Sequence, residues 1–325
     1  MLRLLPGILF VVLIGLANGQ STRESLPEDY QRALQLIHAF SGSGDQLAVA
    51  MQLAEKLSSS HPKGGYSETL RAEALSTWRL SQQGQPAELR AQIIALADQA
   101  LLLNPKLAQA HVARARALLR ASEYDQANKS VDAALELDPT LNGAMFIRAE
   151  IFRRTMQLPE AEAWYLKFIA ATPDRPRQSN GYYWLAVAYR DAAAREQSQR
   201  GSLIARARTA YEKMLELDPD GAWKNVNYAI FLNNDAGDFN AAEKYAQKAL
   251  SIMEFPMARY HLAIARYQKL VPGMNAMDER ALRQAIAQVH ESTGVSFEDA
   301  LKFARSYQTY SGIQARLQSI QVRMR

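Results

Sequence analysis

Cysteine is absent from this chain of 325 residues, and its absence excludes several kinds of protein at once. Without cysteine there are no disulfides, no thiolate metal sites, no catalytic thiol and no residue to carry the lipid of a bacterial lipoprotein. The folded protein must therefore be held together by packing alone. Hydrophobic residues make up 48% of the chain, which is ample material for a core.

Histidine is scarce, and the few histidines are far apart. There are five, and successive ones are separated by at least 23 positions, so none forms the one-turn pair that helical zinc sites use. The chain also lacks a nucleophile elbow, a phosphate-binding glycine loop and a dinucleotide fingerprint. The segment 233–238 lacks the closing glutamate of a calcium loop and is interpreted as a turn that uses Gly237. We predict a protein that is not an enzyme and that has no cofactor or metal ion.

Long apolar runs are missing except at the N-terminus. There, Arg3 precedes an apolar run from Leu4 to Ala17, and Gly19 follows it. The run is 14 residues long, whereas a membrane-spanning helix needs about 20. We therefore predict a signal peptide over residues 1–19, with an uncleaved membrane anchor as the alternative. This predicts an exported protein, with the bacterial periplasm favoured and a secreted or surface-associated form compatible.

Against these absences stands one regular feature, the spacing of prolines. Pro105, Pro139 and Pro173 are 34 residues apart, and each ends a stretch with the same apolar pattern. The packing positions also align, small on small and large on large: Ala115, Leu118, Ala127, Val131 and Ala134 with Ala149, Phe152, Ala161, Tyr165 and Phe168. Each unit is therefore predicted to be two antiparallel helices that cross at small residues and stop at proline.

This period, together with the recurring endings Leu137-Asp138-Pro139 and Leu217-Asp218-Pro219, resembles the tetratricopeptide repeat family. The resemblance implies an all-α fold, a right-handed superhelical solenoid of tetratricopeptide-type helical hairpins. Because each unit buries its apolar face against its neighbours, the whole chain is expected to form one continuous element.

The organisation expected along the chain follows from the proline intervals. Residues 20–62 form a first helical hairpin, and residues 63–105 form an elongated unit. Residues 106–256 are repeats with an insertion around 175–202, expected as a loop at 175–179 and a hydrophilic segment at 190–202. Residues 257–325 hold a degenerate repeat, capping helices, with a candidate cap at 297–310, and a basic C-terminal tail.

The resemblance also implies where a partner binds, because in this family the first helix of each unit lines the concave groove. Counting from the packing alanines gives the candidate groove residues Arg116, Arg120, Phe146, Glu150, Arg153, Arg154, Asn180, Tyr183, Arg190, Trp223, Asn227 and Asn233. Arginine and aromatic residues often dominate binding energy, and asparagine can bond both groups of a peptide backbone. The alternative is that the arginines are solvated surface and that Tyr182, Trp184 and Tyr189 are core.

A carboxylate clamp of lysine, asparagine and arginine is used by the chaperone-binding members of the family. Here Val112, Ile147 and Trp184 stand where polar or basic groups are expected. The sequence therefore does not favour that particular partner.

Positive charge is concentrated at the C-terminal end. Residues 20–299 hold 32 basic and 33 acidic side chains, whereas residues 300–325 hold five basic residues and no acid: Lys302, Arg305, Arg316, Arg323 and Arg325. Such a tail would suit an anionic membrane surface or envelope polymer, and the alternative is a solvated helix face. Nucleic acid is not an expected partner.

Two functions follow from these observations. The leading hypothesis is a non-enzymatic exported adaptor that binds a peptide or protein segment in the concave groove and assists the assembly or regulation of a cell-envelope complex. The alternative is a structural spacer or tether that docks through its basic tail.

Overall fold

The computed structural model describes residues 26–39, 45–78, 87–307 and 310–324, and within these ranges all regular elements are helical. The α-helices are α1 (Glu28–Ala39), α2 (Gln46–Ser60), α3 (Tyr66–Trp78), α4 (Ala87–Leu103), α5 (Ala108–Arg120), α6 (Tyr124–Leu137), α7 (Asn142–Arg154), α8 (Leu158–Ala171), α9 (Arg175–Arg195), α10 (Arg200–Leu217), α11 (Ala222–Phe231), α12 (Phe239–Ile252), α13 (Pro256–Leu270), α14 (Glu279–Thr293), α15 (Phe297–Arg305) and α16 (Ser311–Arg323). Shorter helical turns are η2 (Gln197–Gln199), η3 (Leu232–Ala236) and η4 (Val271–Ala276). The expected signal peptide lies outside the described residues.

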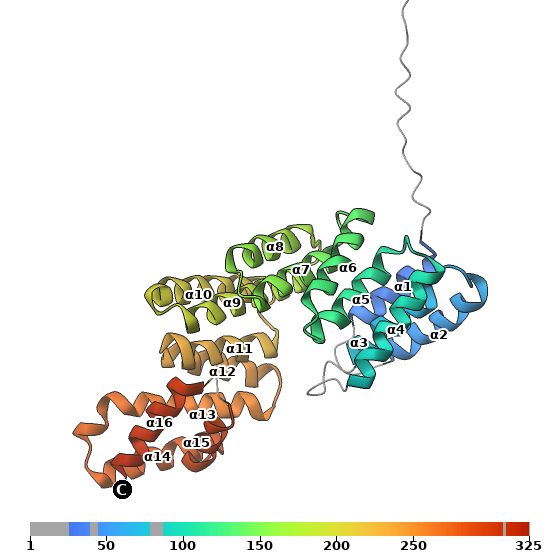
Figure 1. Cartoon of the computed structure of the whole chain (residues 1–325). Coiled ribbons are helices and arrows are strands. Elements are labelled where there is room, and N and C mark those ends of the chain that lie inside the picture. The colour runs from blue at the N-terminus through green and yellow to red at the C-terminus, as the bar shows by residue number, and fades with distance from the viewer. Residues whose placement is uncertain (1–25, 40–44, 79–86, 308–309, 325) are drawn as a thin grey trace, which may run out of the picture.

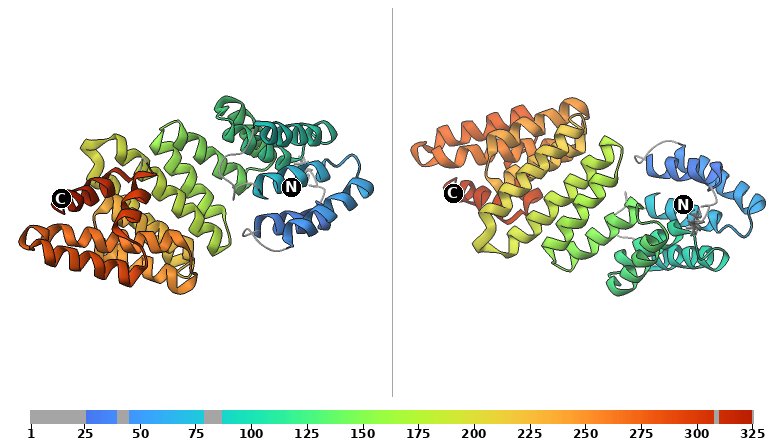
Figure 2. Two further views of the ribbon diagram at one scale, coloured as in Figure 1. Left: turned by 90° about the horizontal axis from the view of Figure 1, so that it is seen from below. Right: turned by 90° about the horizontal axis from the view of Figure 1, so that it is seen from above.

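The helices pair in sequence order and stack into a solenoid, which confirms the predicted fold class (Figure 1). The two helices of each hairpin pack together, as α5 does with α6, α7 with α8, and α9 with α10. Figure 2 shows an elongated molecule with α1 and α2 at one end and α14 to α16 at the other. Each hairpin therefore buries its apolar side mainly against its direct neighbours.

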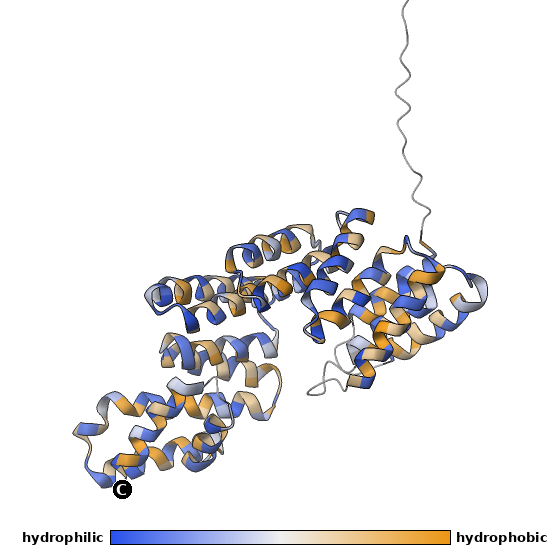
Figure 3. Ribbon diagram, in the orientation of Figure 1, coloured by the Kyte–Doolittle hydropathy of each residue, from blue (hydrophilic) through white to orange (hydrophobic). Residues whose placement is uncertain are grey.

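Alanine forms the crossing point of each central hairpin. Ala115 and Ala127 are fully buried where α5 crosses α6, and Ala149 and Ala161 are fully buried where α7 crosses α8. The same arrangement recurs with Ala186 and Ala207, and with Ala229 and Ala242. Because a methyl group lets two helix backbones approach closely, the larger residues fill the space beside each crossing. Figure 3 shows the resulting mixture of hydrophobic and hydrophilic residues along every helix.

The turns inside the hairpins also repeat. Ser122 and Met156, 34 residues apart, both adopt a left-handed conformation, with φ of 63° and 65°. Each lies seven residues after its crossing alanine, whereas the left-handed Gly237 lies eight residues after Ala229. The extra residue is accommodated in η3, which is a single π-helical turn. The interpretation of segment 233–238 as a turn that uses Gly237 is therefore confirmed.

The insertion lengthens two helices, so the loops expected within residues 175–202 are wrong in part. Residues 175–179 belong to α9, which begins after Asp174, and the Asp174 carboxylate accepts a 2.8 Å hydrogen bond from the backbone N–H of Arg177. This cap and Pro176 in the first turn both favour a helix start at residue 175, because a proline there lacks only an N–H that has no partner within the helix. Helix α9 then runs for 21 residues, and only a short turn separates it from α10.

The helix expected at 297–310 as the cap is shorter than predicted, and a second helix follows it. Helix α15 ends at Arg305, where the Ser306 hydroxyl donates a 2.7 Å hydrogen bond to the carbonyl of Phe303, and α16 starts at Ser311. Helix α16 turns back onto η3, η4, α13 and α15. Its Gly312 lies so close to η3 that a β-carbon there would be 3.1 Å from the carbonyl oxygen of Asn234.

Candidate partner-binding face

The first helices of the hairpins form the inner face of the solenoid. Helix α1 contacts α3, α3 contacts α5, α5 contacts α7, and α11 contacts α13, whereas the second helices mainly contact the first helices beside them. The side on which successive units approach most closely is the inside of a curve. We therefore call the side formed by α3, α5, α7, α9 and α11 the inner face.

Two predicted arginines of α5 lie beside α3. Arg116 forms an ion pair with Glu73, whose side chain is 2% exposed. Arg120 donates a 3.2 Å hydrogen bond to the backbone carbonyl of Ser76. Burial, followed by repulsion from Arg116, lowers the pKa of Arg120 to about 10. Arg120 therefore carries a charge that its surroundings stabilise only weakly.

Glu150 is the centre of a buried ionic group on α7. It is 3% exposed, and both its carboxylate oxygens accept 2.9 Å hydrogen bonds from the guanidinium of Arg153. The hydroxyl of Tyr165 donates to the same carboxylate, while Nε of Arg154 lies 3.6 Å from it. Burial raises the pKa of Tyr165, and the neighbouring Glu150 raises it further, so the hydroxyl keeps its proton and its role as donor.

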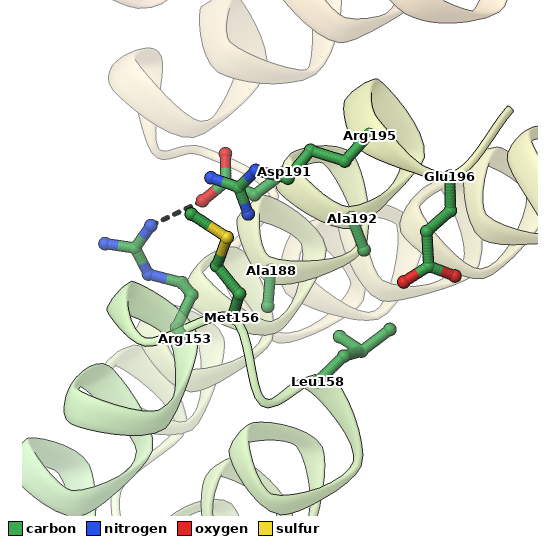
Figure 4. A pocket seen from close by; sticks show the side chains of 8 residues that line it. All are labelled: Arg153, Met156, Leu158, Ala188, Asp191, Ala192, Arg195 and Glu196. Carbon is green, nitrogen blue, oxygen red and sulfur yellow. Dashed lines mark hydrogen bonds and ion pairs between the residues drawn. The ribbon is translucent and has the colours of Figure 1, made fainter.

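Arg153 also connects α7 to the next first helix. Its Nη1 lies 2.5 Å from Oδ2 of Asp191 on α9, as the dashed line in Figure 4 shows. The pair borders a small cavity of about 40 Å³ between α7, the start of α8 and α9, lined by Arg153, Met156, Leu158, Ala188, Asp191, Ala192, Arg195 and Glu196.

One repeat further on, Arg190 makes the corresponding connection from α9 to η3. Its Nε donates a 2.8 Å hydrogen bond to Asp235, and its Nη1 donates a 3.2 Å hydrogen bond to the hydroxyl of Tyr211. Seven charged residues linked by the contacts between α3, α5, α7 and α9 are named here as the inner-face cluster: Arg116, Arg120, Arg153, Arg154, Glu73, Glu150 and Asp191.

The acids of these pairs were not among the predicted site residues. Asp191 could have been found by extending the same count, because it lies five residues after its crossing alanine, as Arg120 and Arg154 do. The count misses Asp235, which lies six residues after Ala229. The count alone does not reveal which acid meets which arginine.

The remaining predicted residues lie toward the start of the first helices. Trp223 is 54% exposed and its ring lies 5.1 Å from that of Phe255, while Asn180 is also exposed. The hydroxyl of Tyr183 lies 3.5 Å from the side-chain oxygen of Asn227, whose amide donates to the backbone of Trp223. These residues combine apolar area with hydrogen-bonding groups on one surface.

Two predicted residues serve internal packing. Phe146 is half-buried and its ring contacts those of Tyr165, Phe168 and Trp184. Asn233 has no exposed surface, and its amide donates a 3.1 Å hydrogen bond to the carbonyl of His261. The π-turn explains this placement, since one extra residue rotates the subsequent side chains by about 100° around the helix axis.

Tyr182, Trp184 and Tyr189 belong to the core or pack against it, in agreement with the alternative interpretation of these aromatic residues. A shallow surface depression of about 500 Å³ lies beside them, between α8, α9 and α10, and includes Tyr182 and Lys213 in its lining. The sequence did not predict it, since no repeat position marks it.

The basic tail is folded rather than extended. Arg316 is half-buried, donates a 2.7 Å hydrogen bond to the carbonyl of Asn233 and also bonds to Gln268. Arg305 and Arg323 are exposed, and each donates one hydrogen bond within the chain, whereas Lys302 is exposed; Arg325 lies outside the described residues. The positive charge that faces solvent is therefore smaller than the sequence count.

Within the described ranges, the side chains of histidine, aspartate and glutamate form no group that could hold a metal ion. The helices found there are also too short or too polar for a membrane span.

Comparison with known proteins agrees with this architecture. Residues 94–142 and 112–176 match the tetratricopeptide repeat family. Human IFIT1, solved as a dimer with PPP-AAAA, aligns with 91% of this chain and 71% of its own, at 16% identity and a TM-score of 0.56. PilF of Pseudomonas aeruginosa aligns with 75% of this chain and 100% of its own, at 17% identity and a TM-score of 0.48. No curated protein matches the sequence.

The stacked hairpins and their inner face define a helical-repeat scaffold. The 34-residue period and the match over residues 94–176 show which kind: the hairpins of this scaffold are tetratricopeptide-type repeats. Proteins of this type generally bind proteins or peptides and are generally not catalytic.

Proposed function

We propose that this protein is an exported adaptor that binds a peptide or protein segment on its inner face and assists the assembly or regulation of a cell-envelope complex. The proposal of export rests on the apolar run behind Arg3. The proposal of binding rests on the inner face itself.

The observation that carries the proposal is the exposure of Trp223. An indole that is 54% exposed at the start of an inner helix leaves much apolar area in water. Tryptophan in such a position is a frequent source of binding energy, and the exposed Asn180 supplies groups that can bond a peptide backbone. A partner segment that covers Trp223 would bury this area.

The ion pairs of the inner face support the same function through rigidity. Arg116, Arg153 and Arg190 are each held by an acid within the chain. Because their side chains are already ordered, a partner that meets this surface costs less conformational entropy than one that must order free arginines.

Site-specific photo-crosslinking tests the binding face. A photoreactive residue replaces the exposed Asn180 on α9, and a matched control replaces the exposed Lys129 on the second helix α6. In the cell envelope, the Asn180 position should capture a protein that the Lys129 position does not, and the Trp223→Ala substitution should reduce the yield at least severalfold. Equal capture from both positions, or no effect of Trp223→Ala, would contradict the proposal.

Export is tested separately. Residues 1–30 are fused to a reporter enzyme that is active only outside the cytoplasm, and Ile8, Val11 and Leu13 are replaced by arginine in the control. The native segment should give activity and the control should not, because three charges destroy the apolar run. An inactive native fusion would remove the exported part of the proposal while leaving the binding face intact.

A further inference from the structure

The inner-face cluster contains more guanidinium groups than carboxylates. Its four arginines face three acids, and each of the three acids is engaged by Arg116 or Arg153. Arg120, at the end of α5, donates a hydrogen bond to a backbone carbonyl. Arg154, at the end of α7, forms only a 3.6 Å ion pair with Glu150, whose carboxylate already accepts two hydrogen bonds from Arg153. Two guanidinium groups thus lie on one surface with donors to spare.

The surroundings of Arg120 disfavour the extra positive charge of the cluster. Arg120 is half-buried, and its hydrogen bond within the described residues goes to a backbone carbonyl. Burial and the repulsion of Arg116 and Arg154 disfavour its charge, and Glu73, which is paired with Arg116, offsets this only in part. The last turn of a helix attracts a cation, but such a site does not replace a carboxylate partner.

We propose that Arg120 and Arg154 bind a side-chain carboxylate of an acidic peptide segment. This inference rests on the proposed function and names the chemistry of the partner at one point on the inner face. The contact differs from the clamp of the chaperone-binding relatives, because Val112 and Ile147 are buried apolar residues here.

Charge balance favours a carboxylate over a nucleic acid. The cluster has four positive and three negative side chains, so one monoanionic group makes its charges equal. A chain of phosphates would also meet acids in and beside the cluster. Asp191 and Asp235 lie on the path along α9 toward η3 and would repel successive phosphates. A peptide with separated acidic residues avoids that repulsion.

The test is fluorescence anisotropy with a labelled decapeptide in which glutamate alternates with alanine. Arg120→Gln and Arg154→Gln should each raise its Kd about tenfold, the loss expected for one charge-assisted hydrogen bond. The matched control is Arg206→Gln, since Arg206 pairs with Glu162 between the second helices α10 and α8 and its replacement changes the net charge equally. This control should change Kd less than twofold, and circular dichroism should show the same helical content throughout.

Three results would overturn the inference. One is an unchanged Kd in Arg154→Gln, whose side chain is 35% exposed and whose replacement should not disturb folding. Another is equal affinity for a decapeptide in which glutamine replaces glutamate. The third is a single-stranded RNA decamer that binds more tightly than the peptide and is lost in the same variants. If partner crosslinking at Asn180 persists in any of these cases, only the acidic chemistry has failed and the adaptor function stands.

Discussion

The guanidinium of Arg114 donates a 2.6 Å hydrogen bond to the carboxylate of Asp98, joining the second helix of one repeat to the first helix of the next. Arg148 and Asp132 form the same pair 34 residues later. In a later unit the hydroxyl of Tyr228 donates to Glu212 across the same interval of 16 residues. The same contact between adjacent repeats therefore occurs three times, twice as an arginine–aspartate pair and once as a tyrosine–glutamate hydrogen bond.

Removing the Arg114–Asp98 contact should lower the stability of the protein modestly. Arg114→Ala is expected to lower the free energy of unfolding by about 1 kcal/mol, because the pair is partly exposed and Arg114 also bonds to Ser130. A double-mutant cycle with Asp98→Ala, measured by urea unfolding, should give a coupling of roughly 0.5 kcal/mol. Purely additive effects would show that the contact contributes nothing.

Removing the buried acid of α7 should have a much larger effect. Glu150→Ala leaves Arg153 and Tyr165 without their common partner in a buried setting, so we expect a loss of roughly 3 kcal/mol in the free energy of unfolding. Tyr165→Phe removes one neutral donor and should cost about 1 kcal/mol. Unfolding in guanidinium chloride measures the free energy of unfolding of both variants. Equal losses of stability in Glu150→Ala and Tyr165→Phe would contradict this account.

The left-handed turn at Ser122 offers a gain in stability. With φ of 63°, this exposed serine occupies a region that glycine adopts without strain. Ser122→Gly should raise the melting temperature, because glycine removes the backbone strain at this position. Glycine also increases the entropy of the unfolded chain, so the net stabilisation should be about 0.5 kcal/mol. The nearby exposed Asp125, in the first turn of α6, is the control, and its replacement by glycine should destabilise because glycine is a poorer helix former and removes an acid that favours the helix N-terminus.

A buried histidine should make stability depend on pH. Burial lowers the pKa of His261 to about 3, and its Nε2 lies 3.2 Å from the hydroxyl of Tyr310. The unfolded chain binds a proton near pH 6.5 while the folded chain does not, so the contribution of His261 is complete above that pH and is lost as the pH falls toward 3. The loss reaches about 1.4 kcal/mol per pH unit.

The comparison with His261→Gln isolates this contribution. Between pH 6.5 and 4, urea unfolding of the native protein should show a steeper decline in stability than the variant, because glutamine does not titrate. Parallel curves for the two proteins would mean that His261 gains a proton in the folded state without penalty.

Much of the fold could be predicted from the sequence because its determinants are local and repeated. The alanines at 115, 149, 186 and 229 mark helix crossings, and each is fully buried there. The prolines and the Asp-Pro endings mark where second helices stop. The loop expected at 175–179 was wrong because Asp174 caps a helix at that point and Pro176 lies in its first turn, where proline is favoured.

The candidate site was predictable only in part. The count of repeat positions placed Arg116, Arg153 and Arg190 on the first helices, where they are found. It did not reveal that acids of adjoining units hold them, nor that Asn233 is buried. These facts depend on how one unit is rotated against the next.

By itself, the sequence determined the helical hairpins, their crossings and the solenoid, because a 34-residue apolar period acts within each unit and between nearest neighbours. Only the tertiary structure decided which charges meet, where the π-turn shifts the register and how α16 folds back onto α13. Those outcomes depend on helix lengths and inter-unit rotation, which insertions change without altering the period of the repeat.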